Sequence, residues 1–399
     1  MTNEAFRPLL EGLLVLDFSR ILAGPYCTAM LGDLGARVIK VEPPQGDDQR
    51  RMGVIVDGES ASFAMINRNK QGIRLDLGRP EGRRIALQLA QRADVVVENF
   101  RPGVAEKLGI GYEQLAVVNE RLVYCSVSGF GQRGPLAATP AYDIVAQALS
   151  GLMSITGDPQ GPPTLVGESV GDICAGMFAA WGIVSALYAR ERTGRGRHVD
   201  VAMFDSLFAM LPTALTQYLY AGVEPVRVGN RHPLSSPFGV YAARDGHYVL
   251  AAANDKLFAA VAGVVGQPEL IADPRFATDA ARSRHDADLR ERIEGWSRPI
   301  DLAQVVAAFE SAGVPCAPIQ GIHAAASGSQ VRSRELLVAS RHHAFGDCRL
   351  APQPVKFSST ASNRAVSAPG LGEHTDTVLT DLLGFDAASI ARLRTAGVV

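Results

Sequence analysis

Two glycine-rich motifs and one aspartate have the residue types and spacing to carry chemistry. GFGQRG at 129–134 fits GxGxxG, which binds a dinucleotide when its last glycine opens a helix at the pyrophosphate. Here Pro135 and Pro140 follow instead, and Asp158, the acid about 20 residues further on, falls in a DPQGPP turn. We predict a glycine-rich loop at this place and no dinucleotide site.

The second motif, GESVG at 167–171, is a literal GxSxG between the apolar TLV (164–166) and a predicted helix. That context is typical of a nucleophile elbow and would make Ser169 the nucleophile of a serine hydrolase. An elbow needs a long central strand, however, and TLV comes directly out of a Pro-Pro turn. A hydrolase therefore stays an alternative.

Asp172 lies one residue beyond that motif. Aspartate is a preferred helix N-cap, and ICAGMFAAWGIV begins a helix directly after it. A carboxylate at a helix N-terminus also lies near backbone N–H donors, which could stabilise the oxyanion formed when it attacks a thioester. Capping and nucleophilic catalysis are compatible roles, and both remain open from the local sequence.

The elements that position these residues alternate in the first half of the chain. Short apolar segments separated by amphipathic helices predict an α/β fold with a parallel sheet covered on both faces. The predicted strands are 13–19, 36–42, 72–77, 94–100 and 121–130, and the predicted helices between them are 25–35, 80–93 and 111–119.

The rest of the chain is mainly helical up to about residue 222, and a second unit begins near Gly229. One stretch, 173–189, carries no charge for 17 residues, which is at the lower limit for crossing a bilayer. It is rich in alanine and glycine, which are weakly hydrophobic. We predict a buried core helix there and no membrane span.

The composition excludes several classes of protein. A net charge of −2 gives no broad basic footprint for nucleic acid. The five cysteines are scattered and form no CxxC pair, which argues against a zinc site or a disulfide framework and for a reducing compartment. The first residues lack the apolar stretch of a signal peptide. We expect a cytoplasmic protein without a metal, nucleic-acid or membrane partner.

Longer motifs carry a resemblance to a known family. They are the opening LEGLLVLDFSRILAGPYCTAMLGDLGARVIKVEPP, DVVVENFRPGVAEKLG, SVSGFGQRGP, PAYDIVAQALSG, GESVGDICAGMFAAWGI, TGRGRHVDVAMFDS, DPRF, VPCAPI and the closing IARLRTAGVV. Together they resemble the class III CoA-transferases, also called the CaiB/BaiF or formyl-CoA transferase family. The resemblance covers nearly the whole chain.

The resemblance implies a large domain with a Rossmann-like parallel sheet, made from both ends of the chain, and a smaller central α/β domain. Two subunits of such enzymes interlock like chain links, so a homodimer is expected. Applied to this sequence, the pattern implies the first part of the large domain at 1–195, linker helices at 196–228, the small domain at 229–322 and a return to the large domain at 323–399.

The resemblance also implies a mechanism in which Asp172 is the nucleophile. Its carboxylate attacks the acyl-CoA donor to give a mixed anhydride, and the released thiolate converts this into an aspartyl-CoA thioester. An acceptor acid then takes the place of the donor acid, and the steps run backwards. Coenzyme A is part of the substrate, and no tightly bound cofactor is expected.

The family's coenzyme A contacts fall on the ends of predicted strands. Arg101 and Lys107 suit phosphate groups, and the backbone of LDL (75–77) suits adenine. The residues implied are Arg20, Leu22, Ala23, Leu75, Asp76, Asn99, Phe100, Arg101, Lys107 and Tyr142.

Two departures bear on the substrate. Formyl-CoA:oxalate transferases carry a glutamine where this chain has Leu22, and a run of glycines where 229–239 reads GNRHPLSSPFG. This segment looks more like the acetyl-CoA:oxalate branch, which favours a dicarboxylic acceptor such as oxalate. The substrate residues proposed from it are Gly229, Asn230, Arg231 and His232.

Two further alternatives stay open beside the hydrolase. The α-methylacyl-CoA racemase branch has a histidine base in a GHD motif, where this chain has AYD at 141–143. Without that histidine, proton abstraction is disfavoured and transfer is preferred over racemisation. The other alternative is a relative that binds coenzyme A without catalysis.

Overall fold

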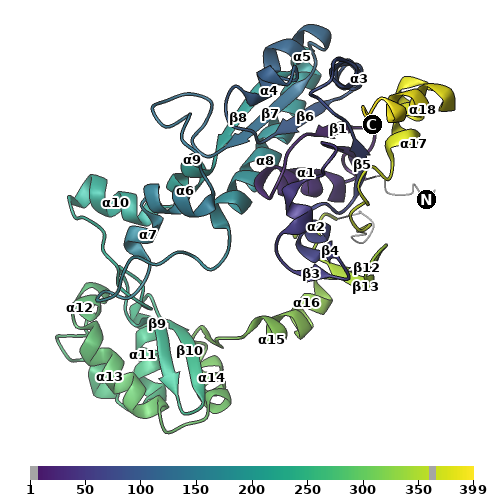
Figure 1. Cartoon of the computed structure of the whole chain (residues 1–399). Helices are drawn as coiled ribbons and strands as arrows, with labels where there is room; N and C mark the ends of the chain where they lie inside the picture. Colours follow the sequence, from purple (N-terminus) through teal and green to yellow (C-terminus); the bar gives the residue numbers. More distant parts are fainter. Residues whose placement is uncertain (1–7, 359–364) are drawn as a thin grey trace. The chain divides into compact units, whose positions relative to one another are not determined.

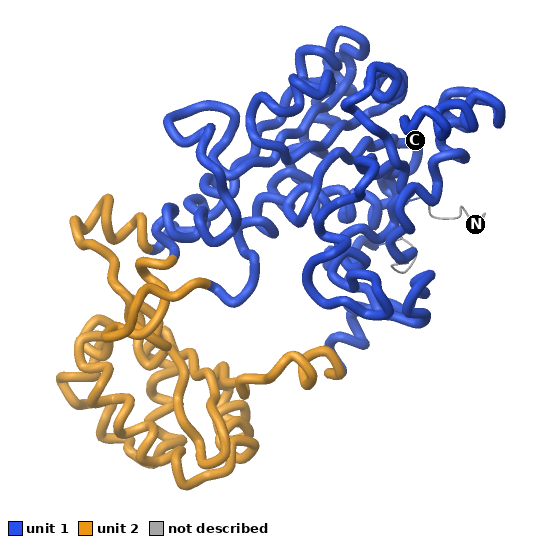
Figure 2. The backbone as a smooth tube through the Cα atoms, viewed as in Figure 1, with its two compact units in different colours: residues 1–152, 166–213, 329–399 blue, residues 153–165, 214–328 orange. Residues whose placement is uncertain are grey.

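The computed structural model describes residues 8–358 and 365–399. Its contacts divide the chain into two compact units (Figure 2), each built from separate stretches of sequence. Unit 1 comprises residues 1–152, 166–213 and 329–399, and unit 2 comprises 153–165 and 214–328. The sequence prediction placed its boundaries after residues 195, 228 and 322, and it did not anticipate the short segment 153–165 in the central unit.

Unit 1 is built on a six-stranded parallel sheet, so the predicted α/β class is confirmed. The strand order β5-β2-β1-β6-β7-β8 is that of a Rossmann sheet, because the chain winds outward from β1 to one edge and then from β6 to the other. The strands are β1 (Leu14–Asp17), β2 (Arg37–Glu42), β5 (Lys70–Arg74), β6 (Val95–Glu98), β7 (Val123–Ser128) and β8 (Arg197–Ala202).

Four of these strands fall within predicted segments, β5 overlaps its segment but begins two residues earlier, and β8 was not predicted. The prediction of linker helices from residue 196 is wrong for β8, which pairs in parallel with β7 at the edge of the sheet. Arg197 and His198 are exposed there. Because one side of an edge strand faces solvent, its sequence lacks the continuous apolar run of the central strands.

Helices cover both faces of the sheet, as a parallel sheet requires (Figure 1). Val15, Val95 and Val97 face one layer, whereas Leu16 and Val96 face the other, since successive side chains of a strand alternate. The first layer holds α1 (Ala23–Asp33), α6 (Asp143–Leu149), α8 (Val170–Thr193) and α9 (Met203–Ala209); the second holds α3 (Pro80–Ala90), α5 (Tyr112–Val118), α17 (Thr375–Leu383) and α18 (Ala387–Thr395).

Helix α8 is long and apolar enough to cross a membrane by length and composition, with 44% of its most apolar window buried. It packs against α1 in unit 1, and Arg190 near its end forms a 2.9 Å ion pair with Asp94. These contacts agree with the predicted core helix. A stripe of apolar side chains nevertheless stays exposed on it: Met177, Phe178, Trp181, Val184 and Tyr188.

The other elements of unit 1 are short. They are η1 (Asp48–Arg51), β3 (Ile55–Val56), β4 (Glu59–Ser60), α2 (Ala61–Ile66), α4 (Val104–Lys107), α16 (Ser329–Ser333), β12 (Val338–His342) and β13 (Gly346–Leu350). Helices α7 (Leu152–Ile155) and α10 (Pro212–Ala221) lie where the chain passes between the units.

Unit 2 has an antiparallel sheet in the order β11-β10-β9, with a hydrophobic core of its own. Its elements are β9 (Phe238–Ala243), β10 (Gly246–Ala251), α11 (Asp255–Val264), η2 (Pro268–Ile271), α12 (Asp279–Arg284), α13 (Asp286–Ser297), α14 (Leu302–Ser311), β11 (Cys316–Pro318) and α15 (Ile322–Ser327).

Candidate active site

A cavity of about 510 Å³ in unit 1 opens where β1, β6 and β7 end. In open α/β sheets ligands bind outside the carboxyl ends of the strands, at the point where the winding direction reverses. That reversal lies here between β1 and β6. The lining residues used below are Arg20, Ala23, Asn99, Arg101, Tyr142 and Asp172.

Asp172 lies in the first turn of α8, with its side chain only partly exposed. Of the two roles that the sequence left open for it, capping does not apply, because Ser169 occupies the N-cap position and the helix begins at Val170. No strand forms at residues 164–166, so the strand of a nucleophile elbow is absent before Ser169. Asp172 lines the cavity and Ser169 does not.

Helix α1 approaches Asp172 closely because α8 carries a glycine one turn further on. A Cβ at Gly176 would lie 2.8 Å from the carbonyl oxygen of Ala23, nearer than any side chain tolerates. The backbone N–H of Ala23, the first residue of α1, lies close enough to the Asp172 carboxylate to lower its pKa. The positive end of the α1 dipole thus faces the carboxylate.

The surroundings of Asp172 shift its titration. Burial raises the pKa of Asp172 most, the nearby negative charge of Asp143 raises it as well, and the N–H of Ala23 opposes both, so that the pKa lies at about 7. A carboxyl group whose pKa lies near neutrality within a cavity is typical of a functional site. In its ionised form this carboxylate is poorly solvated, which favours nucleophilic attack.

Asp143 is the site residue that the sequence analysis missed. Its Oδ1 accepts a 2.6 Å hydrogen bond from the backbone N–H of Gly171, and its Oδ2 accepts one of 2.7 Å from Gln147. A Cβ at Gly171 would lie 2.9 Å from that Oδ1, so glycine permits the contact. The signal was present in PAYD, where the sequence analysis considered only the missing histidine.

Replacement of Asp143 is expected to change the pH profile of kcat/KM. In the wild type, kcat/KM falls as pH drops through about 7, because only the ionised Asp172 attacks. Asp143→Asn removes a negative charge that disfavours ionisation, so this acid limb moves to lower pH. Initial rates between pH 5 and 9 measure the limb. Asp48→Asn, another carboxylate lining the cavity, serves as the control, and an unmoved limb in Asp143→Asn contradicts the argument.

The cavity brings together most of the residues predicted to hold coenzyme A. Arg20, Ala23, Asn99, Phe100, Arg101 and Tyr142 all line it. Arg20 follows β1, and Asn99 to Arg101 follow β6, so two strand ends supply both basic side chains. Arg101 and Tyr142 are exposed and accessible to a ligand, and a guanidinium pairs well with phosphate.

Four of the predicted residues do not line this cavity: Leu22, Leu75, Asp76 and Lys107. The backbone N–H groups of Leu75 and Asp76 donate to the carbonyl oxygens of Glu42 and Val398, so those donors are already used within unit 1. Lys107 is exposed at the end of α4. A role for these four in binding coenzyme A stays a prediction.

The predicted substrate segment, Gly229 to His232, belongs to unit 2 and lies beside its sheet. Arg231 forms a β-bridge with Gly239, and the His232 ring stacks on Phe238 at 4.8 Å between centroids. The Gly229 N–H donates to the Gly157 carbonyl, so the backbone of this segment is well held. Its role toward a substrate stays a prediction.

The GFGQRG segment forms a loop after β7 and opens no helix, as predicted. Gly129 nevertheless lines the cavity, so this loop forms part of the cavity wall. Within residues 8–358 and 365–399, no cluster of three or more His, Cys, Asp or Glu side chains is placed to hold a metal ion.

A larger cavity, of about 700 Å³, lies at the other end of α1 and beside the start of β5. Its carboxylate Asp33 is already paired with Arg68 at 2.6 Å. Because ligands of such sheets bind at the carboxyl ends of the strands, the smaller cavity is the better candidate despite its size.

Comparisons with known proteins agree with this geometry. The model of CoA-transferase family III matches residues 10–375. The acetyl-CoA:oxalate CoA-transferase of Acetobacter aceti is 46% identical over 350 residues, covering 87% of this chain and 89% of that protein. The mouse succinyl-CoA:glutarate CoA-transferase is 36% identical over 398 residues, covering 99% and 91%. A CaiB/BaiF family protein from Brucella suis superimposes with a TM-score of 0.82 at 36% identity, covering 94% and 99%.

Proposed function

Because this chain belongs to CoA-transferase family III, we propose that it moves coenzyme A from an acyl-CoA donor to a carboxylic acid through the carboxylate of Asp172. The observation that carries the proposal is the position of this carboxylate. It lines the cavity at the carboxyl ends of the sheet, next to the first N–H of α1, and Arg20 lines the same cavity. A carboxylate nucleophile preserves the energy of the thioester as an anhydride and then as a new thioester.

The steps balance without any other reactant. Asp172 attacks the thioester carbonyl, the C–S bond breaks, and an aspartyl–acyl anhydride and CoA thiolate form. The thiolate attacks the aspartyl carbonyl, which releases the donor acid and leaves aspartyl-CoA. The acceptor carboxylate attacks this thioester to form a second anhydride and thiolate. The thiolate then attacks the acceptor's carbonyl, and the carboxylate of Asp172 is regenerated.

Each protein group has a distinct role in this scheme. The Ala23 N–H is placed to stabilise negative charge on an oxygen of Asp172 or of the tetrahedral intermediate formed at it. Arg20 and Arg101 supply positive charge for the phosphates of coenzyme A. Exclusion of water protects the anhydride from hydrolysis.

The alternatives fit the site less well. Among the described residues lining the cavity there is no histidine, so the base of a racemase is missing, and Ala141 occupies the wall instead. A hydrolase using Ser169 lacks both its strand and access to the cavity. A relative that only binds coenzyme A would have no need of a carboxylate whose pKa is raised to about 7 by burial, as that of Asp172 is.

For the acid pair we propose acetyl-CoA as donor and a dicarboxylate such as oxalate as acceptor. The support is the 46% identity to the Acetobacter aceti acetyl-CoA:oxalate enzyme, while other relatives are named for glutarate and mesaconate. Arg231 and His232 are the proposed partners of the second carboxylate.

A matrix of acetyl-, succinyl- and formyl-CoA against oxalate, glutarate and mesaconate, read by the mass of the CoA ester, tests this proposal. The expected result is oxalyl-CoA from acetyl-CoA and oxalate, with acetate released. Free coenzyme A without a new ester indicates hydrolysis, and the absence of oxalyl-CoA from acetyl-CoA and oxalate rejects the proposed acid pair.

We also propose a homodimer in the cytoplasm. The apolar stripe Met177, Trp181, Val184 and Tyr188 on α8 follows helical spacing, and a second copy of the chain is its proposed cover. In the proposed homodimer the two copies of the chain interlock. The five cysteines are free thiols, which suits a reducing compartment.

A further inference from the structure

The turn between β1 and α1 adopts a conformation that its residues do not prefer. Ile21 has a φ of +65°, in the left-handed region that a β-branched side chain rarely enters. Arg20 and Ile21 line the cavity, and Ala23 follows directly at the start of α1. Such a backbone persists only where its surroundings hold it in place.

Hydrogen bonds from the segments on both sides of β1 hold this turn. The Asn99 side chain, after β6, accepts from the Arg20 N–H at 2.7 Å and donates to the Arg20 carbonyl at 2.7 Å. On the other side, Asp47 Oδ1 accepts from the Ile21 N–H at 3.1 Å, and Lys40 Nζ donates to the Ser19 carbonyl at 2.9 Å. Each residue of the turn from 19 to 21 is thus fixed through its backbone.

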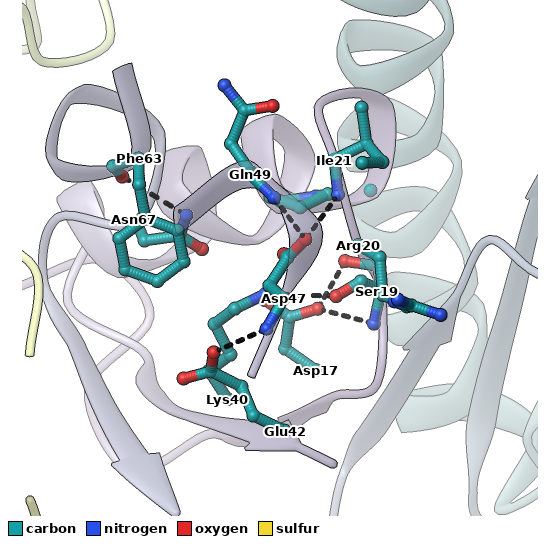
Figure 3. A network of polar contacts seen from close by, with 12 residues as sticks. Asp17, Ser19, Arg20, Ile21, Lys40, Glu42, Asp47, Gln49, Phe63 and Asn67 are labelled. Carbon is teal, nitrogen blue, oxygen red and sulfur yellow. Dashed lines mark hydrogen bonds and ion pairs between the residues drawn. The ribbon is translucent and has the colours of Figure 1, made fainter. Parts of the chain in front are cut away.

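Lys40 and Asp47 form a buried ion pair with 3.0 Å between Nζ and Oδ2, and neither side chain is exposed (Figure 3). Lys40 projects from the middle of β2, the strand next to β1, and Asp47 caps η1, which follows β2 along the chain. Glu42 Oε2 accepts from the Asp47 N–H at 3.0 Å, which fixes the pair in turn. A buried charge pair of this kind is costly to desolvate and is not needed for stability alone.

We propose that Lys40 and Asp47 are positioning residues of the transferase site: they hold the turn at 19–21 so that the Ala23 N–H meets Asp172 and Arg20 lines the cavity. Neither side chain lines the cavity, so they act through the backbone of the turn. This inference rests on the proposed function, because it assigns the turn a part in catalysis by Asp172.

Asp47→Asn is the sharpest test, because the carboxylate receives donors on both oxygens. Oδ1 accepts from the N–H groups of Ile21 and Gln49, and Oδ2 accepts from Lys40. An amide has only one acceptor oxygen, so it must turn its NH₂ toward donors on one side. The turn then shifts while the size of the side chain is kept.

Asp33→Asn is the matched control. Asp33 forms a similarly buried ion pair with Arg68, with 2.6 Å between the two side chains. The Asp33 carboxylate also accepts a hydrogen bond from the Gln353 N–H. It lies at the far end of α1 and has no contact with the turn. Both variants therefore lose a comparable buried interaction, and only one of them disturbs the site.

The measurements are kcat and KM for acyl-CoA, the pH profile of kcat/KM and the thermal midpoint. Asp47→Asn is expected to lower kcat/KM by about 10- to 100-fold, since a displacement of about 1 Å costs that much. Its acid limb moves to higher pH, because the ionised Asp172 loses the nearby N–H of Ala23, which lowers its pKa. Asp33→Asn lowers the thermal midpoint but leaves kcat/KM and the limb unchanged.

An Asp47→Asn enzyme with the wild-type limb and kcat/KM overturns the proposal, and so does an equal effect of Asp33→Asn. If Asp47→Asn does not fold, the double variant Lys40→Met/Asp47→Leu removes both charges without leaving one unpaired, with Arg68→Met/Asp33→Leu as its control. Wild-type values in Lys40→Met/Asp47→Leu, or an equal effect in its control, again overturn the proposal. A wild type that transfers no coenzyme A rejects the proposed function instead, independently of these variants.

Discussion

Asp172→Ala is expected to lower the rate of CoA transfer by about 10⁴-fold or more, because the variant has no group to form the anhydride. Binding of coenzyme A should persist, since Arg20, Asn99 and Arg101 still line the cavity. Initial rates measure the first effect, and calorimetric titration with coenzyme A measures the second.

Chemical labelling tests directly whether Asp172 is the nucleophile. Incubation of the wild type with acyl-CoA and hydroxylamine should convert Asp172 to a hydroxamate that peptide mass spectrometry detects. Ser169→Ala is the control, because Ser169 lies outside the cavity, and its transfer rate should stay within about threefold of the wild type, as surface changes usually do. Loss of activity in Ser169→Ala, or active enzyme with an unmodified Asp172, contradicts the aspartyl mechanism.

Gly176→Ala is expected to affect both stability and activity. The added methyl group would lie 2.8 Å from the Ala23 carbonyl oxygen and 3.1 Å from the Tyr26 ring, so α1 must move away from α8. Overpacking of this kind costs about 1–3 kcal/mol of unfolding free energy. Because Ala23 leaves Asp172 with the helix, kcat/KM should fall by about 100-fold.

Gly182→Ala in the same helix separates this effect from helix propensity. Its methyl group would lie 2.8 Å from Cγ1 of Val199 on β8, so this contact must also shift, but it does not involve α1. Alanine is favoured over glycine within a helix by about 1 kcal/mol, which offsets part of the cost of this contact, and the variant should keep its activity. Thermal unfolding and initial rates on both variants provide the comparison. Equal activity in the two would show that the close contact between α1 and α8 is unimportant for catalysis.

The framework of unit 1 could be predicted because its central strands are buried on both faces. Segments such as 36–42 and 94–100 are short apolar runs bounded by helices, and few other structures suit them. The edge strand β8 could not be predicted in this way, since its polar residues Arg197 and His198 interrupt the apolar pattern. The start of α8 was expected three residues late because Asp172 is a good cap, as is Ser169, which occupies the N-cap position.

Charged residues inside those apolar strands were a signal that the sequence analysis did not use. Asp17, Lys40 and Lys70 are almost completely buried, and a buried charge requires a partner. Their types therefore predict an internal network of ion pairs. Which carboxylate meets which amine depends on strand order, and Lys70 pairs with Asp17 across 53 residues of sequence.

Asp172, the candidate nucleophile, differs in what the sequence determines about it and what the tertiary structure determines. The sequence by itself determined the family, the parallel sheet and Asp172 as the carboxylate to examine, because these rest on residue types and spacing along the chain. Only the tertiary structure decided its surroundings: burial, the charge of Asp143 and the N–H of Ala23, which set its pKa near 7. Those groups come from three helices, and their effects depend on distances that only the packing of α1, α6 and α8 establishes.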